Sequence, residues 1–182
     1  MPIQVYSFYI FDRHTECIYS KQWQHRTPPP PPPSTTLTSP PSSRPTSQQP
    51  SHPSHPSTAT IPPALSAASK RRQDDDAKLI FGTVFSLRNM VRKLGGDDDA
   101  FLAYRTAHYK LHYYETPTNL RFALLTEPGA LSMRNVLHQI YINLWVEYVV
   151  KNPLSPVEHK GGEGVRNEMF EMGLDKFIRG LM

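Results

Sequence analysis

The chain has 182 residues, of which 38% are hydrophobic and 20% charged, and its formal net charge is +4. That charge does not indicate nucleic-acid binding, because residues 28–73 hold four basic and no acidic residues, which leaves the remainder formally neutral without a basic cluster. The single cysteine, Cys17, excludes an intramolecular disulfide and a Cys-x-x-Cys metal site.

Residues 3–11 are apolar or aromatic on both alternating faces, a pattern typical of a central strand covered on both sides. The alternation predicts Val5 and Tyr9 on one face, and Tyr6, Phe8 and Ile10 on the other. A turn then leads to an antiparallel strand over 15–20. The start of the chain has no basic region before Asp12, and no apolar run approaches the roughly 20 residues that cross a bilayer. We therefore expect a cytoplasmic protein.

Residues 28–73 have the composition of an insert in a single domain formed by residues 1–27 and 74–182. Fourteen of the 19 prolines lie between Pro28 and Pro63, and such a tract buries too little apolar surface to offset its ordering entropy. We therefore predict a disordered Pro/Ser/Thr-rich segment between the second strand and the first helix. Arg26 to Pro32 fits an Arg-x-x-Pro-x-x-Pro docking pattern, but any proline run after an arginine would fit it too.

Three aspartates, Asp74–Asp76, predict the first turn of a helix over 74–94, because carboxylates complement the positive end of the helix dipole. Its apolar stripe runs from Ala77 to Leu94, and Gly95-Gly96 end it. Aromatic and Arg side chains are favoured at the centres of interfaces. One shoulder of this helix is therefore a candidate partner-binding surface, unless its aromatic residues cover the edge of their own sheet; it consists of Phe81, Phe85, Arg88 and Arg92.

Alternating residues predict three further antiparallel strands, over 101–107, 109–116 and 119–126. Pro117 and Asn119 predict the hairpin turn between the last two, with Asn119 in the left-handed conformation. His112 and Tyr114 of this hairpin are further candidate partner contacts.

Two helices are predicted after the sheet, over 131–152 and 165–180. Between residues 140 and 150 the apolar side chains point in nearly every direction of an α-helix, so they need cover from several sides. A strand is the alternative for this segment, but its length and its join to Met133 favour a helix. Tyr141 and Trp145 are candidate partner contacts, with internal packing as the other interpretation.

Residues for catalysis or metal binding are missing from the sequence. His112 and Glu115 are the only tempting acid–base pair, yet three positions along a strand put them on opposite faces. No nucleophile-elbow, phosphate-loop or zinc-protease motif occurs. Asp97–Asp99 lack the alternate spacing of an EF-hand. We expect no enzyme activity of the chain itself, no cofactor and no metal.

Five segments, in this order, carry a resemblance to a known family: Phe11–Arg13, Phe81–Arg88, Phe101–Thr106, Tyr109–Thr118 and Tyr148–Leu154. They resemble the family of subunit 1 of the trafficking protein particle (TRAPP) complex, the Bet-five type of small longin-like core subunit. The resemblance implies a longin-like (SNARE-like) α+β fold, a five-stranded antiparallel sheet with one helix on one face and two on the other.

The same resemblance implies a function. It is that of a non-catalytic core subunit of a vesicle-tethering complex, which with other TRAPP subunits promotes nucleotide exchange on a Rab-family GTPase in transport from the endoplasmic reticulum to the Golgi. Membrane association at the endoplasmic reticulum and cis-Golgi would then be indirect. The alternatives are a stand-alone longin-type SNARE-like or adaptor protein, and an adaptor that recruits partners through its proline-rich insert. No heptad helix or anchor follows residue 154, which disfavours a SNARE.

Overall fold

The computed structural model describes residues 2–24, 63–96, 98–159 and 164–182, with side chains from residue 71 onward in the second range. Its elements follow the predicted order, and the predicted α+β class is confirmed. In chain order they are β1 (Val5–Phe11), β2 (Cys17–Gln22), α1 (Pro63–Gly95), β3 (Ala103–Arg105), β4 (Lys110–Glu115), β5 (Arg121–Thr126), α2 (Arg134–Gln139), the π-helix η1 (Ile140–Val150) and α3 (Glu168–Arg179).

The five strands form one antiparallel sheet in the order β2-β1-β5-β4-β3. Tight turns join β1 to β2 and β4 to β5, and each contains a non-glycine residue with positive φ. These are Thr15 at 75° and Asn119 at 61°, the only such residues in the described part of the chain. The left-handed Asn119 confirms the turn predicted from the sequence, since Asn tolerates this conformation better than most residues.

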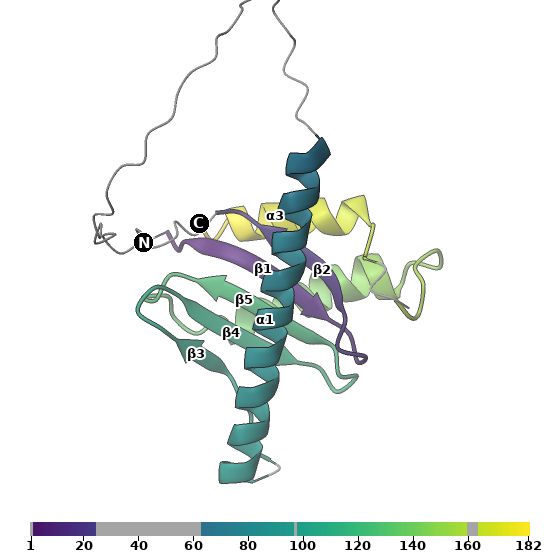
Figure 1. Cartoon of the computed structure of the whole chain (residues 1–182). Coiled ribbons are helices and arrows are strands. Elements are labelled where there is room, and N and C mark those ends of the chain that lie inside the picture. The colour runs from purple at the N-terminus through teal and green to yellow at the C-terminus, as the bar shows by residue number, and fades with distance from the viewer. Residues whose placement is uncertain (1, 25–62, 97, 160–163) are drawn as a thin grey trace, which may run out of the picture.

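Both faces of the sheet are covered, as predicted: α1 crosses the strands on one face, and α2, η1 and α3 lie on the other (Figure 1). Two apolar cores result. The core under α1 includes Tyr9, Phe11, Leu111, Tyr113 and Leu125 of the sheet with Ala77, Ile80 and Val84 of the helix. The opposite core includes Phe8, Ile10, Phe122, Leu124, Leu137, Ile140, Trp145, Phe170, Leu174 and Ile178.

Two face assignments within β1 were wrong. Val5 lies in the core with Phe8 and Ile10, whereas Tyr6 packs with Tyr9 on the side of α1. The cause is an irregularity in the pairing with β5 between Val5 and Ser7, which shifts the register there. A bulge changes which face the following residues occupy, and a strict alternation of residues cannot predict where a bulge occurs.

The predicted start of the first helix at Asp74 was also wrong. α1 begins at Pro63, so residues 63–73, which we assigned to the disordered insert, belong to the helix. Proline fits the first turn of a helix, and the Ala, Lys and Arg residues that follow are good helix formers. The rest of the predicted insert, residues 28–62, lies outside the described residues.

α1 is longer than the sheet is wide. Its 33 residues extend about 50 Å, whereas five strands span only about 20 Å. The helix therefore overhangs the sheet, and its end that carries Gly95 projects beyond β3 and β4 (Figure 1). Leu94, which the sequence placed on the core stripe, is consequently 82% exposed.

The predicted helix over 131–152 consists of the α-helix α2 followed by the π-helix η1, so the strand alternative is wrong. At the end of η1 the Lys151 N–H donates to the carbonyl of Val146, five residues earlier, over 3.0 Å. The wider turn changes the period of the buried face. Ile140, Trp145 and Val149 are buried together, whereas Ile142 and Val150 are exposed.

Candidate partner-binding surface

The shoulder of α1 predicted from the sequence exists as one continuous row, but its residues differ in burial. Phe81 is half-buried against Phe11, with ring centroids 5.4 Å apart, and thus packs on its own sheet. Phe85 stacks on Phe81 at 5.9 Å and remains 45% exposed. Arg88 is half-buried and Arg92 is exposed. The shoulder thus offers one aromatic ring and one arginine to solvent.

An Arg–Glu–Arg cluster joins this shoulder to the sheet. Glu115 accepts from Arg88 Nε at 2.6 Å and from Arg121 Nε at 3.4 Å, and all three side chains are largely buried. Arg121 also donates to the carbonyl of Asp12 at 3.1 Å, and its guanidinium lies 5.9 Å from the Phe81 ring centroid. Because one carboxylate faces two guanidiniums, the cluster keeps a positive charge.

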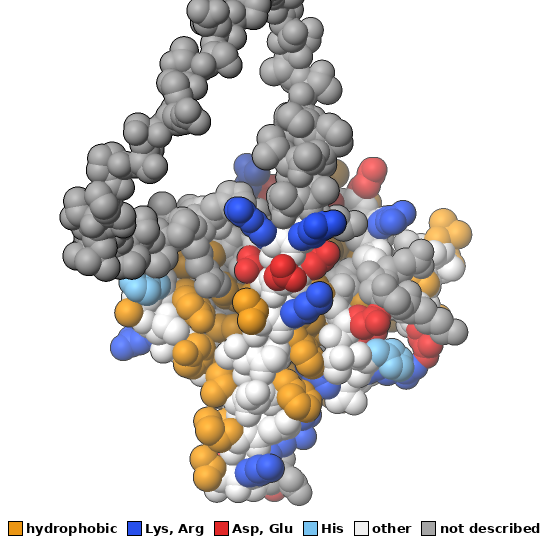
Figure 2. All heavy atoms as spheres, in the orientation of Figure 1, with side chains coloured by type: hydrophobic (Ala, Val, Ile, Leu, Met, Phe, Trp, Pro, Cys, Tyr) orange, Lys and Arg blue, Asp and Glu red, His pale blue; other side chains and the backbone are white. Residues whose placement is uncertain are grey.

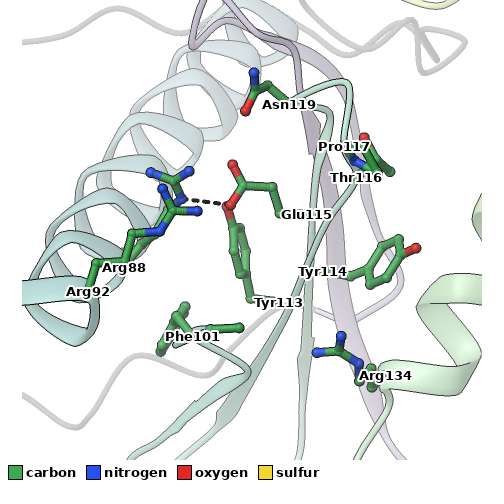
Figure 3. A pocket seen from close by; sticks show the side chains of 11 residues that line it. Arg88, Arg92, Phe101, Tyr113, Tyr114, Glu115, Thr116, Pro117, Asn119 and Arg134 are labelled. Carbon is green, nitrogen blue, oxygen red and sulfur yellow. Dashed lines mark hydrogen bonds and ion pairs between the residues drawn. The ribbon is translucent and has the colours of Figure 1, made fainter. Parts of the chain in front are cut away.

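Beside this cluster a cleft of about 380 Å³ opens at the end of β4 (Figure 3). Arg88 and Arg92 of α1 extend into it on one side, and Arg134 of α2 lines the other end. Tyr113 and Glu115 form part of its floor. Burial, and then the nearby Glu115, raises the pKa of Tyr113, so this phenol stays protonated.

The remaining predicted contacts lie on the opposite face, and two of them are in the core. Trp145 is 6% exposed and makes edge contacts with Phe122 and Phe170, at 6.2 and 5.8 Å between centroids. His112 is 2% exposed, and its Nε2 lies 3.0 Å from Thr126 Oγ1. Neither side chain can meet a partner while this core is closed.

Tyr114 and Tyr141 are half-buried and reach the surface of the helical face. Their rings lie 6.3 Å apart, and the Tyr114 hydroxyl lies 2.8 Å from Nδ1 of the exposed His138. The structure therefore brings Phe81, Phe85, Arg88 and Arg92 together on one face and Tyr114 with Tyr141 on the other. The eight predicted contacts do not form a single surface.

Sequence reasoning missed the outer flank of α1. Leu79 is 70% exposed and Leu94 82%, and Met90 is about half exposed. Hydrophobic side chains accordingly follow α1 and its projecting end in Figure 2. The residues off the core stripe were visible in the sequence, but only the width of the sheet shows which of them remain uncovered. A row of this kind is typical of a protein interface.

The acid–base pair considered in the sequence does not form. His112 and Glu115 point to opposite faces, as predicted, since His112 contacts Thr126 and Glu115 contacts Arg88. Burial raises the pKa of Cys17 to about 11, which keeps this thiol neutral. In the described segments, no three His, Cys, Asp or Glu side chains gather into a metal-ion site. No helix in the described part of the chain has the length and apolar character to cross a membrane.

Comparison with known proteins agrees with the resemblance seen in the sequence. The model of the Sybindin-like family matches residues 5–181. The "Transport protein particle subunit bet5" of Schizosaccharomyces pombe is 40% identical over 97% of each chain. The human "Trafficking protein particle complex subunit 1" is 34% identical over 97% of this chain and 93% of its own. With matches that span nearly the full length of each protein, the chain belongs to the Sybindin-like family.

Proposed function

We propose that this chain is a non-catalytic core subunit of a TRAPP vesicle-tethering complex. The observation that carries the proposal is the uncovered row on α1, Leu79, Met90 and Leu94, on a chain whose relatives bear the names of TRAPP subunits. An exposed apolar row of this length costs solubility unless a partner covers it. Other TRAPP subunits are the partners that the relatives' names suggest.

The finer part of the proposal is that the assembly promotes nucleotide exchange on a Rab-family GTPase during transport from the endoplasmic reticulum to the Golgi. This chain contributes surface to the platform that holds the GTPase, rather than a catalytic side chain. It acts in the cytoplasm and reaches endoplasmic reticulum and cis-Golgi membranes through its partners. The lack of an acid–base pair and of a metal cluster among the described residues is compatible with this passive role.

The test is reconstitution with the other TRAPP subunits. We expect the chain to co-elute with them in size-exclusion chromatography, and the complete assembly to release labelled GDP from a Rab-family GTPase faster than an assembly without it. The chain alone should not accelerate release. A chain that stays monomeric beside those subunits, or that stimulates exchange by itself, would contradict the proposal.

The proline-rich adaptor is distinguished by a deletion. Removal of residues 28–61 leaves α1 intact, because that helix begins at Pro63. If the deleted chain still assembles and supports exchange, recruitment through the proline tract is not its main function. If assembly is normal but transport fails, the adaptor interpretation is favoured.

A further inference from the structure

The cleft at the end of β4 opens because β3 is short. The pairing of β3 with β4 ends at Ala103 and His112, and one further bond joins the Tyr113 N–H to the Leu102 carbonyl at 2.9 Å. β4 continues to Glu115 with β5 on one side and no strand on the side of β3. The resulting space is walled by α1 and by the aromatic rings of Phe101 and Tyr113, which lie 5.5 Å apart between centroids.

The basic groups of this cleft come from both layers of the fold. Arg88 and Arg92 belong to α1, on one face of the sheet, and Arg134 begins α2 on the other. Figure 3 shows the guanidinium groups of Arg88 and Arg92 directed to the same side, with Arg134 at the opposite end. Positive charge therefore occurs at two separate places along the cleft, one from each helical layer.

Two of these three arginines lack a carboxylate partner within the described structure. Arg88 is held by Glu115, which Arg121 shares. Arg92 and Arg134 are exposed, and no carboxylate of the described residues lies within 4.0 Å of either. A guanidinium binds a carboxylate through two parallel hydrogen bonds, which makes arginine the preferred residue for this anion. The cleft thus offers two guanidinium groups that can bind carboxylates, Arg92 at one end and Arg134 at the other, with an apolar wall between them.

We propose that this cleft binds an acidic segment of a partner protein, with one carboxylate at Arg92, another at Arg134 and an apolar side chain between them against Phe101 and Tyr113. A single small anion would reach one end only, whereas a peptide segment spans both. A membrane surface would not enter a cleft of about 380 Å³. The inference deepens the proposed function, because the segment belongs to another member of the assembly.

Photo-cross-linking in the complete assembly tests the inference. A photoreactive residue replaces Arg92 or Arg134 in the full chain, and the same residue at Arg71, an exposed position outside the cleft lining, is the control. We expect positions 92 and 134 to label one partner segment that contains at least two Asp or Glu within about six residues, and position 71 not to label it. Labelling of lipid, of a segment without acidic residues, or of no partner would overturn the inference.

A charge-reversal series then measures the contribution of the arginines. The probe is a fluorescein-labelled synthetic peptide with the cross-linked sequence, titrated into the assembly. R92E/R134E should weaken its binding by roughly tenfold or more, R92K/R134K should weaken it less, and the matched R71E/R72E should leave it unchanged. Equal weakening by the control pair would show attraction to net charge alone and would overturn the inference.

Failure of this inference differs visibly from failure of the proposed function. If the chain does not co-elute with TRAPP subunits, the proposed function is wrong. If it co-elutes but positions 92 and 134 do not label an acidic segment, the assembly stands and only the assignment of the cleft is wrong.

Discussion

Arg88 of α1 donates to the carboxylate of Glu115 at 2.6 Å, across the gap between the helix and the end of β4. Glu115 also faces Arg121, its direct cross-strand neighbour in the β4–β5 hairpin. One carboxylate therefore fixes the position of α1 on the sheet and orients one wall of the basic cleft. This contact links the packing of α1 on the sheet to the cleft of the further inference.

Removal of this carboxylate should destabilise the fold. In Glu115→Gln two guanidiniums lose their counter-charge in a largely buried place, and we expect the free energy of unfolding to fall by about 1–3 kcal/mol. Urea denaturation of the assembled subunit or of the chain measures the change. The control is Glu147→Gln, which breaks the exposed pair with Lys151 and should have little effect. Equal effects of the two variants would mean that the Glu115 cluster has no special structural role.

Trp145 should act as a core residue rather than a partner contact. Trp145→Ala leaves a cavity beside Phe122 and Phe170 and should lower the free energy of unfolding by about 3–5 kcal/mol. Ile142→Ala, on the exposed side of the same π-helix, is the control and should cost much less. If the Trp145→Ala variant had normal stability but failed to assemble, Trp145 would be a partner contact and this prediction would be wrong.

His112 should make stability depend on pH between about 4 and 6.5. Burial, helped by the nearby Lys110, lowers its pKa to about 4 in the folded chain, whereas the unfolded chain has an ordinary value near 6.5. The unfolded state therefore binds more protons in this window, so stability rises with pH there and falls by up to about 3 kcal/mol on acidification.

The test compares the free energy of unfolding at several pH values in wild type and in His112→Gln. The variant should lose most of the slope between pH 4 and 6.5 that this histidine adds. His108→Gln, which removes an exposed histidine, is the matched control. The same slope in His112→Gln and in wild type would show that His112 does not contribute.

The outer flank of α1 should be required for assembly but not for folding. Leu79→Glu with Leu94→Glu places two charges in the uncovered row, and we expect co-elution with the other subunits to be lost while circular dichroism stays native. Leu154→Glu with Val157→Glu is the matched control, since these two aliphatic side chains are also strongly exposed but lie in the loop after η1. Loss of assembly in the control, or none in the first pair, would contradict this assignment.

The left-handed conformation of Asn119 predicts that glycine and alanine at this position change the stability in opposite directions. Asn119→Gly should be neutral or slightly stabilising, because glycine adopts a φ of 61° without a steric cost. Asn119→Ala should cost about 1 kcal/mol, since its Cβ is strained there. Thermal unfolding of the two variants measures the difference, and a more stable alanine variant would contradict the turn assignment.

The sequence predicted what depends on local pattern. The hairpin around Asn119, the opposite directions of His112 and Glu115 and the helices on both faces follow from residue type and a period of two or 3.6. The Glu115–Arg121 pair could also have been predicted, because the turn fixes their register. Such features need no knowledge of distant parts of the chain.

The sequence predictions failed where the spacing of buried residues changes along an element, or where burial depends on a residue far away in the sequence. A bulge moved Val5 to the other face, and the wider turn of η1 gathered Trp145 and Val149 into one core with Ile140, from which an α-helical wheel separates them. The exposure of Leu94 depends on where the sheet stops beneath α1. Arg92 and Arg134, 42 positions apart in the sequence, meet at one cleft only because two layers end together there.

The exposed apolar side chains of α1 also affect the steady-state amount of this protein in a cell. A copy made in excess of its partner would keep Leu79 and Leu94 in water, where chaperones and proteases recognise exposed apolar side chains. The steady-state amount of the chain should then track the supply of whichever protein covers the helix, and unpaired copies should be degraded.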